Sequence, residues 1–311
     1  MRPAAPAPLL LVIVGPTAAG KTAISLRLAA EFNGEIVSAD SRLFYRGMDI
    51  GTAKPSAVER ARIPHHLIDI CEPDETVTLG QYQEMAYRVI DAVHQRGRLP
   101  ILVGGTGQYV MAVVEGWGIP RVPPHPRLRQ ALSALGGEEL GRWLRMLDPV
   151  AAGRLDLRNV RRVIRALEVA LIAGRPISLL QRKTPPPYDV CLLGLRLERE
   201  SLYRRIDARV DQMMAAGLVA EVERLHDAGY GRHLPAMSGL GYRQLWAYLE
   251  GELELVEAVE RIKFETHRFA RQQATWFRED DSRIHWFKTE ENAEIAVMEF
   301  VRQWLARNRI T

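Results

Sequence analysis

Residues 15–22, Gly-Pro-Thr-Ala-Ala-Gly-Lys-Thr, constrain the fold of this chain more than any other segment. They match the P-loop pattern G-x-x-x-x-G-K-[ST], with the apolar run Leu9–Val14 before them and the helically spaced segment Lys21–Phe32 after them. The glycines of such a loop let successive backbone N–H groups point at a phosphate, and the helix N-terminus adds partial positive charge. A chance glycine-rich turn would not explain the strand and helix on either side. The segment therefore predicts a phosphate-binding loop.

All eight loop residues are candidate phosphate or diphosphate contacts: Gly15, Pro16, Thr17, Ala18, Ala19, Gly20, Lys21 and Thr22. Lys21 supplies a point charge for the outer phosphates, and the Thr22 hydroxyl is a candidate Mg²⁺ ligand. The loop does not identify the reaction, because nucleotide kinases and ATPases share it. An ATPase would have an acid that holds Mg²⁺ at the end of a second strand, whereas the apolar run Leu99–Val103 ends in Gly-Gly-Thr-Gly. Asp40 and Asp69 remain candidates for that acid, but the pattern favours a transferase over a motor or switch.

Strands alternate with helices in the first part of the chain. Strands are predicted at Leu9–Val14, Glu35–Ala39, His66–Ile70 and Leu99–Val103, and helices at Lys21–Phe32 and Tyr82–Arg96. This alternation predicts an α/β fold with a P-loop NTPase-like parallel sheet. Later predicted elements are strands at Val190–Leu197 and Ile284–Phe287, and helices at Ser201–Asp227, Leu253–Arg278 and Ala293–Ala306.

A helical block interrupts this α/β pattern. Proline-rich linkers begin at Pro120 and Pro185, and the segment Arg127–Ala173 between them reads as helices only. We therefore expect three parts: a P-loop core over residues 1–119, an inserted all-helical domain over 120–188, and the rest of the core with C-terminal helices over 189–311.

The helical block carries an excess of positive charge. Residues 127–175 contain ten arginines and five acidic residues, although the net charge of the whole chain is only +4. Arg158, Arg161, Arg162 and Arg165 are spaced to form one face of a helix, and like charges stacked in this way repel unless a partner supplies anions. The pattern favours a polyanion such as RNA, and the alternative is a solvated face partly paired with Asp156.

Composition indicates the compartment. The two cysteines, Cys71 and Cys191, form neither a disulfide framework nor a metal motif, which is typical of a reducing cytosol. No segment has the length and apolar character of a membrane span or a signal peptide. We therefore expect a cytoplasmic protein with no membrane partner, and a monomer.

Several strings together resemble the tRNA dimethylallyltransferases, also called tRNA isopentenyltransferases, of the IPP transferase family. After the Gly15-Pro16-Thr17 opening, the strings in family order are Ala39–Tyr45, Met48–Pro55, Val103–Gly107, Gly241–Gln244 and Gln273–Trp276. One departure is Arg271-Gln272-Gln273, where the family motif often begins Lys-Arg-Gln, so one phosphate contact is lost or moved. The chain also lacks the zinc-finger extension of eukaryotic relatives, which favours the bacterial type.

The resemblance implies transfer of a dimethylallyl group from dimethylallyl diphosphate to the exocyclic amine of the adenosine on the 3′ side of a tRNA anticodon, with Mg²⁺ and release of diphosphate. It assigns Asp40 as the general base, Thr17 to the bridging oxygen, and Arg209 to the distal diphosphate. From the residues alone, Asp40 ends a strand beside the P-loop, where ligands of open α/β sheets bind, which favours the general-base role; the alternatives are a helix cap and a Mg²⁺ ligand. For Arg209 the alternative is a helix-surface ion pair with Asp207 or Asp211.

The resemblance also implies contacts with the tRNA anticodon stem-loop. Trp276 belongs to this set, although its spacing from Phe269 and Ile262 favours core packing; His65 and His66 are interpreted as structural. The closest alternatives are an adenylate isopentenyltransferase and a P-loop small-molecule kinase. The implied RNA-contacting residues are Asp40, Ser41, Arg42, Leu43, Thr106, Arg161, Arg162, Val163, Ile164, Arg165, Ser238, Gly239, Leu240, Gly241, Tyr242, Arg243, Arg271, Gln272, Gln273, Ala274, Thr275, Trp276, Phe277 and Arg278.

Overall fold

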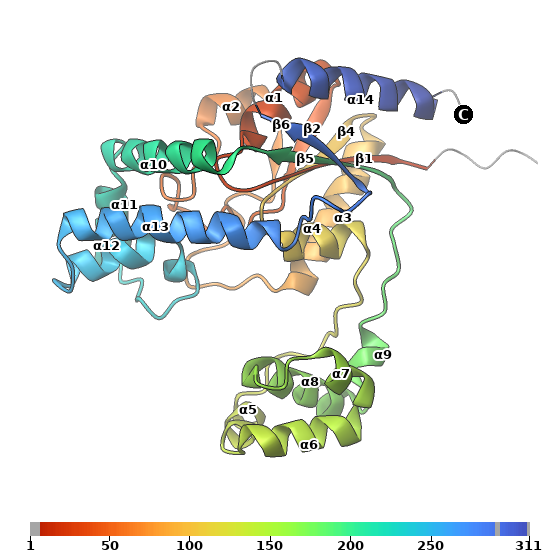
Figure 1. The fold of residues 1–311 in the computed structure, drawn as a ribbon, viewed down its shortest axis with the longest axis vertical. Helices are drawn as coiled ribbons and strands as arrows, with labels where there is room; N and C mark the ends of the chain where they lie inside the picture. The colour runs from red at the N-terminus through yellow and green to blue at the C-terminus, as the bar shows by residue number, and fades with distance from the viewer. Residues whose placement is uncertain (1–6, 290–292, 310–311) are drawn as a thin grey trace, which may run out of the picture. The chain divides into compact units, whose positions relative to one another are not determined.

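The computed structural model describes residues 7–289 and 293–309. It divides into two compact units, one formed by Met1–Val110 with Pro187–Thr311 and the other by Met111–Pro186. The predicted domain boundaries at 120 and 188 stay a prediction, and the predicted domain ends at 1 and 311 lie outside the described residues. The first unit is called the sheet unit below, and the second the helical unit (Figure 1).

The sheet unit is built on one parallel sheet, as the alternation of strands and helices predicts. Its six described strands lie in the order β3-β2-β4-β1-β5-β6. The central strand β1 pairs with β4 on one side and with β5 on the other, so that Leu11 lies opposite both Ile101 and Cys191. The strands are β1 (Leu9–Val14), β2 (Gly34–Ser38), β3 (His65–His66), β4 (Leu99–Val103), β5 (Asp189–Arg196) and β6 (Ile284–Lys288).

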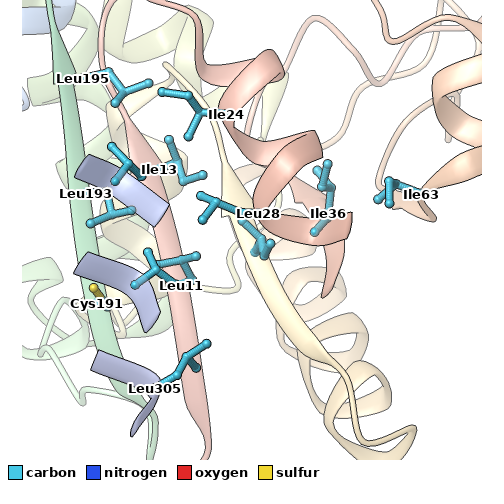
Figure 2. Close-up of a cluster of buried hydrophobic side chains, with 14 of the residues drawn as sticks. Leu11, Ile13, Ile24, Leu28, Ile36, Ile63, Cys191, Leu193, Leu195 and Leu305 are labelled. Atoms are coloured by element: carbon cyan, nitrogen blue, oxygen red, sulfur yellow. The ribbon is translucent and has the colours of Figure 1, made fainter. Parts of the chain in front are cut away.

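One face of the sheet is covered by α1 (Lys21–Glu31) and α14 (Ala293–Arg309). Leu11 and Ile13 of β1 and Leu193 of β5 pack there with Leu28 of α1 and Leu305 of α14 in one buried cluster (Figure 2). Each fully buried side chain of this size stabilises the fold by about 1.5–3 kcal/mol. The cluster therefore fixes the start of α1, and with it the end of the P-loop, against the central strands.

The alternate residues of the strands face the other way, where α3 (Leu79–Gln95) packs against β2 and β4. The Tyr82 side chain of α3 is fully buried, and its hydroxyl donates a hydrogen bond of 3.1 Å to the Ser38 carbonyl at the end of β2. Its ring stacks on those of Phe44 and Tyr109. This aromatic cluster supports the segment that follows β2, where Asp40 lies.

Three predicted elements differ from the structure. The third strand is confined to His65–His66, because Leu67 and Asp69 have positive φ angles of 60° and 55° that an extended strand cannot contain. The predicted helix Ser201–Asp227 is two helices, α10 (Arg199–Ala215) and α11 (Leu218–Asp227), separated at Gly217 with a φ of 94°.

The predicted helix Leu253–Arg278 is shorter in the structure, where α13 spans Leu255–Ala274. Elements outside the predicted helix ranges are α2 (Ala57–Arg62), α4 (Gly107–Val114), α9 (Ile177–Leu180), the 3₁₀ turn η1 (Ala236–Ser238) and α12 (Tyr242–Leu249). Over residues 7–289 and 293–309, no helix combines the length and the apolar character needed to cross a bilayer.

The helical unit has a core of its own. Leu140, Leu144, Val163 and Leu167 are fully buried in one apolar cluster. Helix α4 (Gly107–Val114) leads into the unit. The helices inside the unit are α5 (Pro126–Ser133), α6 (Gly137–Leu147), α7 (Pro149–Arg154), α8 (Val160–Ala173) and α9 (Ile177–Leu180).

The two ends of the helical unit are joined to each other. An antiparallel bridge pairs Trp117 with Lys183. On either side of the bridge, the Gly118 N–H donates to the Arg182 carbonyl at 2.7 Å, and the Thr184 N–H donates to the Gly116 carbonyl at 2.8 Å. The chain therefore enters and leaves this unit through one short two-stranded clasp, residues 116–118 and 182–184.

Candidate active site

The P-loop joins β1 to α1 and has positive φ angles at Gly15 (145°), Ala18 (63°) and Gly20 (90°). A Cβ atom on Gly15 would lie 2.5 Å from the Leu195 carbonyl oxygen, so a larger residue would push β1 away from β5. Helix α1 begins at Lys21, directly after Gly20. The loop thus presents backbone N–H groups at a helix N-terminus, an arrangement suited to an anion.

The Lys21 ammonium lies inside the loop. It donates hydrogen bonds of 3.0 Å to the Gly15 carbonyl and 2.8 Å to the Pro16 carbonyl. The pKa of Lys21 is lowered to about 8, mainly by desolvation; the Asp40 charge opposes this change and the Arg209 charge contributes to it. A bound polyphosphate would stabilise the charged form, so the site is matched to an anion of high charge.

Asp40 follows β2 at the same edge of the sheet. Its Oδ1 atom accepts a hydrogen bond of 2.9 Å from the Arg42 N–H, and its own N–H donates to the Ser38 hydroxyl at 3.3 Å. No helix begins here, so Asp40 does not cap one. The turn orients the carboxylate, which is partly exposed and lines a cavity.

Arg209 reaches the site from α10. Its predicted alternative, a surface ion pair with Asp207 or Asp211, is wrong, because Asp207 is bonded to His267 and Asp211 to Lys263. Among the described residues Arg209 has no hydrogen bond or ion pair, and burial lowers the pKa of its guanidinium while the Asp40 charge opposes this. Arg209 therefore offers its hydrogen-bond donors to whatever occupies the cavity.

One cavity of about 720 Å³ within the sheet unit is lined by residues from each of these elements. Its lining includes Thr17 from the P-loop, Asp40 from the end of β2 and Arg209 from α10. Segments far apart in the chain complete the lining: Ser41, Arg42, Gly51, Thr52, Gly105 to Gln108, Ile206, Val210, Met213, Ser238 to Arg243, Ile262, Glu265, Thr266, Arg268, Phe269, Gln272, Gln273 and Trp276.

Gln273, for which the resemblance implies an RNA contact, also forms hydrogen bonds within the protein. It is buried, with 5% of its surface exposed. Its Oε1 accepts a hydrogen bond of 2.8 Å from the Thr17 N–H, and its Nε2 donates one of 2.9 Å to the Gly105 carbonyl. One side-chain amide therefore connects the P-loop to the turn after β4.

The other residues of the 271–278 segment divide into two groups. Trp276 is 42% exposed and lines the cavity, and its ring packs on Gly107, so the expected core packing is wrong. Phe277 is instead the buried aromatic residue, at 3% exposure, and the RNA contact that the resemblance implies for it stays a prediction. Arg271 donates to the Tyr203 hydroxyl, and Arg278 is paired with Asp280.

The predicted residues Ser238 to Arg243 all line the cavity, together with Ser41 and Arg42. Arg42 is held by this segment: its guanidinium donates to the Pro235 carbonyl at 2.9 Å and to the Ser238 hydroxyl at 3.1 Å. Leu43 is not part of the lining, and Arg243 is ion-paired with Glu265.

Asp69, the other candidate for a strand-end acid, is committed to an ion-pair cluster. Its carboxylate contacts Lys54 at 2.5 Å and Arg60 at 2.6 Å. Burial acts to raise the pKa of Asp69, but the bonds and charges of Lys54 and Arg60 outweigh it and lower the pKa. The Lys54 side chain, 2% exposed, also pairs with Asp49 at 2.7 Å. Asp69 is therefore engaged in this ion-pair cluster and is not among the residues that line the cavity.

The arginine-rich helix α8 belongs to the helical unit and differs in part from the prediction. It begins at Val160, capped by the Asn159 side chain, so Arg158 precedes the helix and pairs with Asp156. Arg165 is bonded at 2.6 Å to Glu168, a fully buried carboxylate.

The remaining predicted RNA-contacting residues of α8 are either exposed or buried. Arg161 and Arg162 are exposed on the first turn of the helix. Val163 and Ile164 are buried in the helical unit's core, and the RNA contact that the resemblance implies for them stays a prediction. The exposed positive charge at this helix start is therefore that of Arg161 and Arg162.

Comparison with known proteins decides the family. The model of the IPP transferase family matches residues 43–280, which is more than half of the chain. The chain belongs to the IPP transferase family. The resemblance found in the sequence is thereby confirmed.

Relatives and solved structures agree with this assignment. The chain is 52% identical over 300 residues to a tRNA dimethylallyltransferase of Roseiflexus sp. (strain RS-1), covering 95% of this chain and 98% of the relative. It is 48% identical to that of Dehalococcoides mccartyi, over 96% and 93% of the two chains.

Two solved structures resemble the fold. The crystal structure of the tRNA isopentenylpyrophosphate transferase from Bacillus halodurans has a TM-score of 0.73 at 39% identity, covering 97% of this chain and 98% of that one. A eukaryotic dimethylallyltransferase acting on tRNA has a TM-score of 0.86 at 25% identity, covering 96% of this chain and 80% of that one.

Sequence reasoning missed part of the lining of this IPP transferase cavity. Ile206, Val210 and Met213 face it from α10 alongside Arg209, and Phe269 faces it from α13. The spacing of three and four residues on α10 marks one helix face and is a signal that could have found them. These apolar side chains make one part of the cavity suited to a hydrocarbon group.

We predict that Gln273→Ala lowers turnover about tenfold or more. The variant leaves the Thr17 N–H and the Gly105 carbonyl without their partner, each at a cost of about 1–3 kcal/mol, and frees the P-loop to move. Gln273→Glu should also lower turnover, because a carboxylate oxygen would face the Gly105 carbonyl. Steady-state kinetics, with the exposed Gln303→Ala of α14 as the control, test this prediction; equal activity of all four proteins would contradict it.

We also predict that affinity for inorganic diphosphate weakens as pH rises above about 8. The folded pKa of Lys21 is lowered, so the free protein loses this positive charge above that pH, and the anion must then bind a neutral amine. Calorimetric titrations between pH 7 and 10 measure the effect. Lys21→Arg keeps its charge and should lose this component of the pH dependence, whereas identical profiles for the two proteins would exclude Lys21 as the titrating group.

Proposed function

We propose that this chain is a tRNA dimethylallyltransferase. It transfers a dimethylallyl group from dimethylallyl diphosphate to the exocyclic amine of the adenosine 3′-adjacent to the tRNA anticodon, and it releases diphosphate. The observation that carries the proposal is that Thr17 of the P-loop, Asp40 and Arg209 line the same cavity in this family member. A phosphate site, a carboxylate and a free guanidinium are the groups that this transfer requires.

The donor's diphosphate is assigned to the P-loop side of the cavity. As the bond from carbon to the bridging oxygen breaks, its electron pair leaves on the diphosphate, and Lys21, Arg209 and the loop amides stabilise the added charge. We assign the Thr17 hydroxyl, in the cavity lining, to hydrogen-bond the bridging oxygen. The apolar wall formed by Ile206, Val210 and Met213 can receive the hydrocarbon.

We assign Mg²⁺ to Thr22, whose hydroxyl has no hydrogen-bond partner among the described residues and lies at the start of α1. No three His, Cys, Asp or Glu side chains within the described ranges form a metal cluster. A P-loop ion fits this, because it takes most of its ligands from phosphates and water. When bound, Mg²⁺ supplies charge neutralisation to the diphosphate.

The acceptor adenosine is assigned to the Asp40 side. The lone pair of its exocyclic amine is delocalised into the ring, so the amine becomes an adequate nucleophile only as it loses a proton. The amine nitrogen forms a bond to the dimethylallyl carbon while one of its protons passes to the Asp40 carboxylate. Among the described residues, Asp40 accepts one hydrogen bond, from the Arg42 N–H, which leaves acceptor capacity for that proton.

The RNA must deliver its base into the cavity, so the adenosine leaves the anticodon stack. Ser41, Arg42 and Ser238 to Arg243 line that part of the cavity and are proposed to contact the flipped nucleotide. The exposed Arg161 and Arg162 of the helical unit are proposed to contact phosphates of the stem-loop. We further propose a monomer that acts in the cytoplasm; two buried, unpaired cysteines are compatible with this.

A direct comparison of acceptors tests the function. The purified protein is given labelled dimethylallyl diphosphate and either unmodified tRNA or AMP, and the products are separated by mass. We expect prenylated tRNA and no prenylated AMP, with activity lost when EDTA removes divalent metal. Transfer to AMP would identify an adenylate isopentenyltransferase, and phosphorylation of a small molecule with ATP would identify a kinase.

We predict that Asp40→Ala and Asp40→Asn each lower transfer by about 10²- to 10⁴-fold, the usual contribution of a positioned general base. tRNA binding should be largely retained, because the carboxylate contributes repulsion rather than attraction to RNA phosphates. Filter binding and single-turnover transfer measure the two effects, with the exposed Asp74→Asn as the control. Turnover at the unmodified rate in either Asp40 variant would exclude the general-base role.

A further inference from the structure

The segment Met48–Pro55 marks the family in the sequence but has no part in the mechanism above. In the structure it is a tight loop, in which the Ala53 N–H donates to the Ile50 carbonyl at 2.9 Å. Gly51 and Thr52 at its tip line the cavity. The loop therefore forms part of the cavity wall, and its position depends on the contacts that hold it.

The anchor of the loop is Glu221, a buried residue of α11 with 1% of its surface exposed. Its Oε2 atom accepts the N–H groups of Asp49 at 2.9 Å and Ile50 at 2.8 Å, and its Oε1 atom accepts that of Gly51 at 3.1 Å. Among the described residues Glu221 has no cationic partner, so hydrogen bonds alone compensate its burial. A carboxylate held in this way is sensitive to the loss of any one donor.

Tyr242, at the start of α12, shares the same carboxylate. Its hydroxyl donates to Glu221 Oε1 at 2.6 Å. Burial, followed by the neighbouring Glu221, raises the pKa of Tyr242 well above its usual range, so the hydroxyl remains a donor. The ring lies directly on Gly51, where an added Cβ atom would come within 2.6 Å of it. Glu221 thus ties together two pieces of cavity wall that are far apart in the sequence.

This pair of walls adjoins the Asp40 side of the cavity. A Cβ atom on Gly239 would lie 3.2 Å from the Tyr242 ring and 3.8 Å from the Arg42 guanidinium, so these side chains are neighbours. The Arg42 N–H in turn donates to Asp40. The P-loop side is anchored separately, by Gln273.

We propose that Glu221 is a positioning residue for the acceptor nucleotide: it fixes Gly51 and Tyr242 at the spacing that admits the tRNA adenosine beside Asp40. The inference rests on the proposed function. Glu221 does not line the cavity and acts only through the loop and Tyr242. A second anchor, the Lys54 ion-pair cluster, holds the base of the loop away from the cavity and is independent of Glu221.

Glu221→Gln is the first test. The side chain keeps its size, but its amide nitrogen then faces N–H and O–H donors, so at least one of the four bonds is lost. We expect the KM for tRNA to rise about tenfold to a hundredfold, the scale of a small misplacement in a binding site. The Kd for inorganic diphosphate should not change, because the P-loop has its own anchor. Glu223→Gln, exposed on the same helix, is the matched control.

Two further variants keep the test open if Glu221→Gln does not fold. Tyr242→Phe removes one donor and keeps the ring, so it should raise the KM for tRNA in the same direction but less. Gly51→Ala leaves Glu221 intact and displaces the loop from the Tyr242 ring, so it should reproduce the rise in KM.

The outcomes are separable from the proposed function. If the unmodified protein does not prenylate tRNA, the proposed function fails whatever the variants do. If it does, a raised KM for tRNA with unchanged diphosphate affinity supports the positioning role. The role is overturned if the variants keep the unmodified KM, or if KM, diphosphate affinity and thermal stability all deteriorate together, as a purely structural residue would predict.

Discussion

The close approach of three parallel strand ends is the constraint on which this site depends. The Ala39 N–H donates to the Val103 carbonyl at 2.8 Å, and the Gly104 N–H donates to the Ile13 carbonyl at 3.2 Å, so the ends of β2, β4 and β1 are bonded in sequence. At Gly104 a Cβ atom would lie 2.3 Å from the Ala39 carbonyl oxygen, which leaves room for glycine alone. This contact brings Asp40, the P-loop and the Gly-Gly-Thr-Gly turn to one edge, where ligands of open α/β sheets bind.

Charge is balanced around that edge without direct ion pairs. Lys21 bonds carbonyl oxygens, Asp40 bonds a backbone N–H, and Arg209 has no bond among the described residues, although the Asp40 charge acts to raise the pKa of both Lys21 and Arg209. Salt bridges are formed elsewhere, as between Lys54 and Asp69. Because Lys21 and Arg209 form no ion pairs within the described protein, their positive charges remain available to attract an incoming anion.

Sequence patterns predicted those features of the fold that depend on residues close together in the chain. The P-loop, its flanking strand and helix and the parallel sheet follow from residues adjacent in sequence, and the family followed from short strings. Other features depend on distant contacts: Gln273 meets Thr17 across 256 positions, and periodicity alone placed Trp276 in the core. The left-handed residue Asp69 shortened β3, and neither its φ angle nor its bond to Lys54 can be read from apolar spacing. Likewise, the spacing of the arginines predicts that Arg165 is free to bind RNA, whereas in the structure it is bonded to the buried Glu168.

The clasp formed by residues 116–118 and 182–184 has a consequence for how the chain tolerates its long insertion. Bringing together the ends of a flexible loop costs conformational entropy that grows with its length. Here the ends of the helical unit are bonded to each other at 2.7 and 2.8 Å, and the unit has its own apolar core. The entropy cost of closing the loop is therefore compensated by bonds and packing within the insertion. For the sheet, the connection between β4 and β5 is then equivalent to a short loop. Helices within such a module can lengthen, shorten or be exchanged over generations while the strands beneath the phosphate loop keep their register.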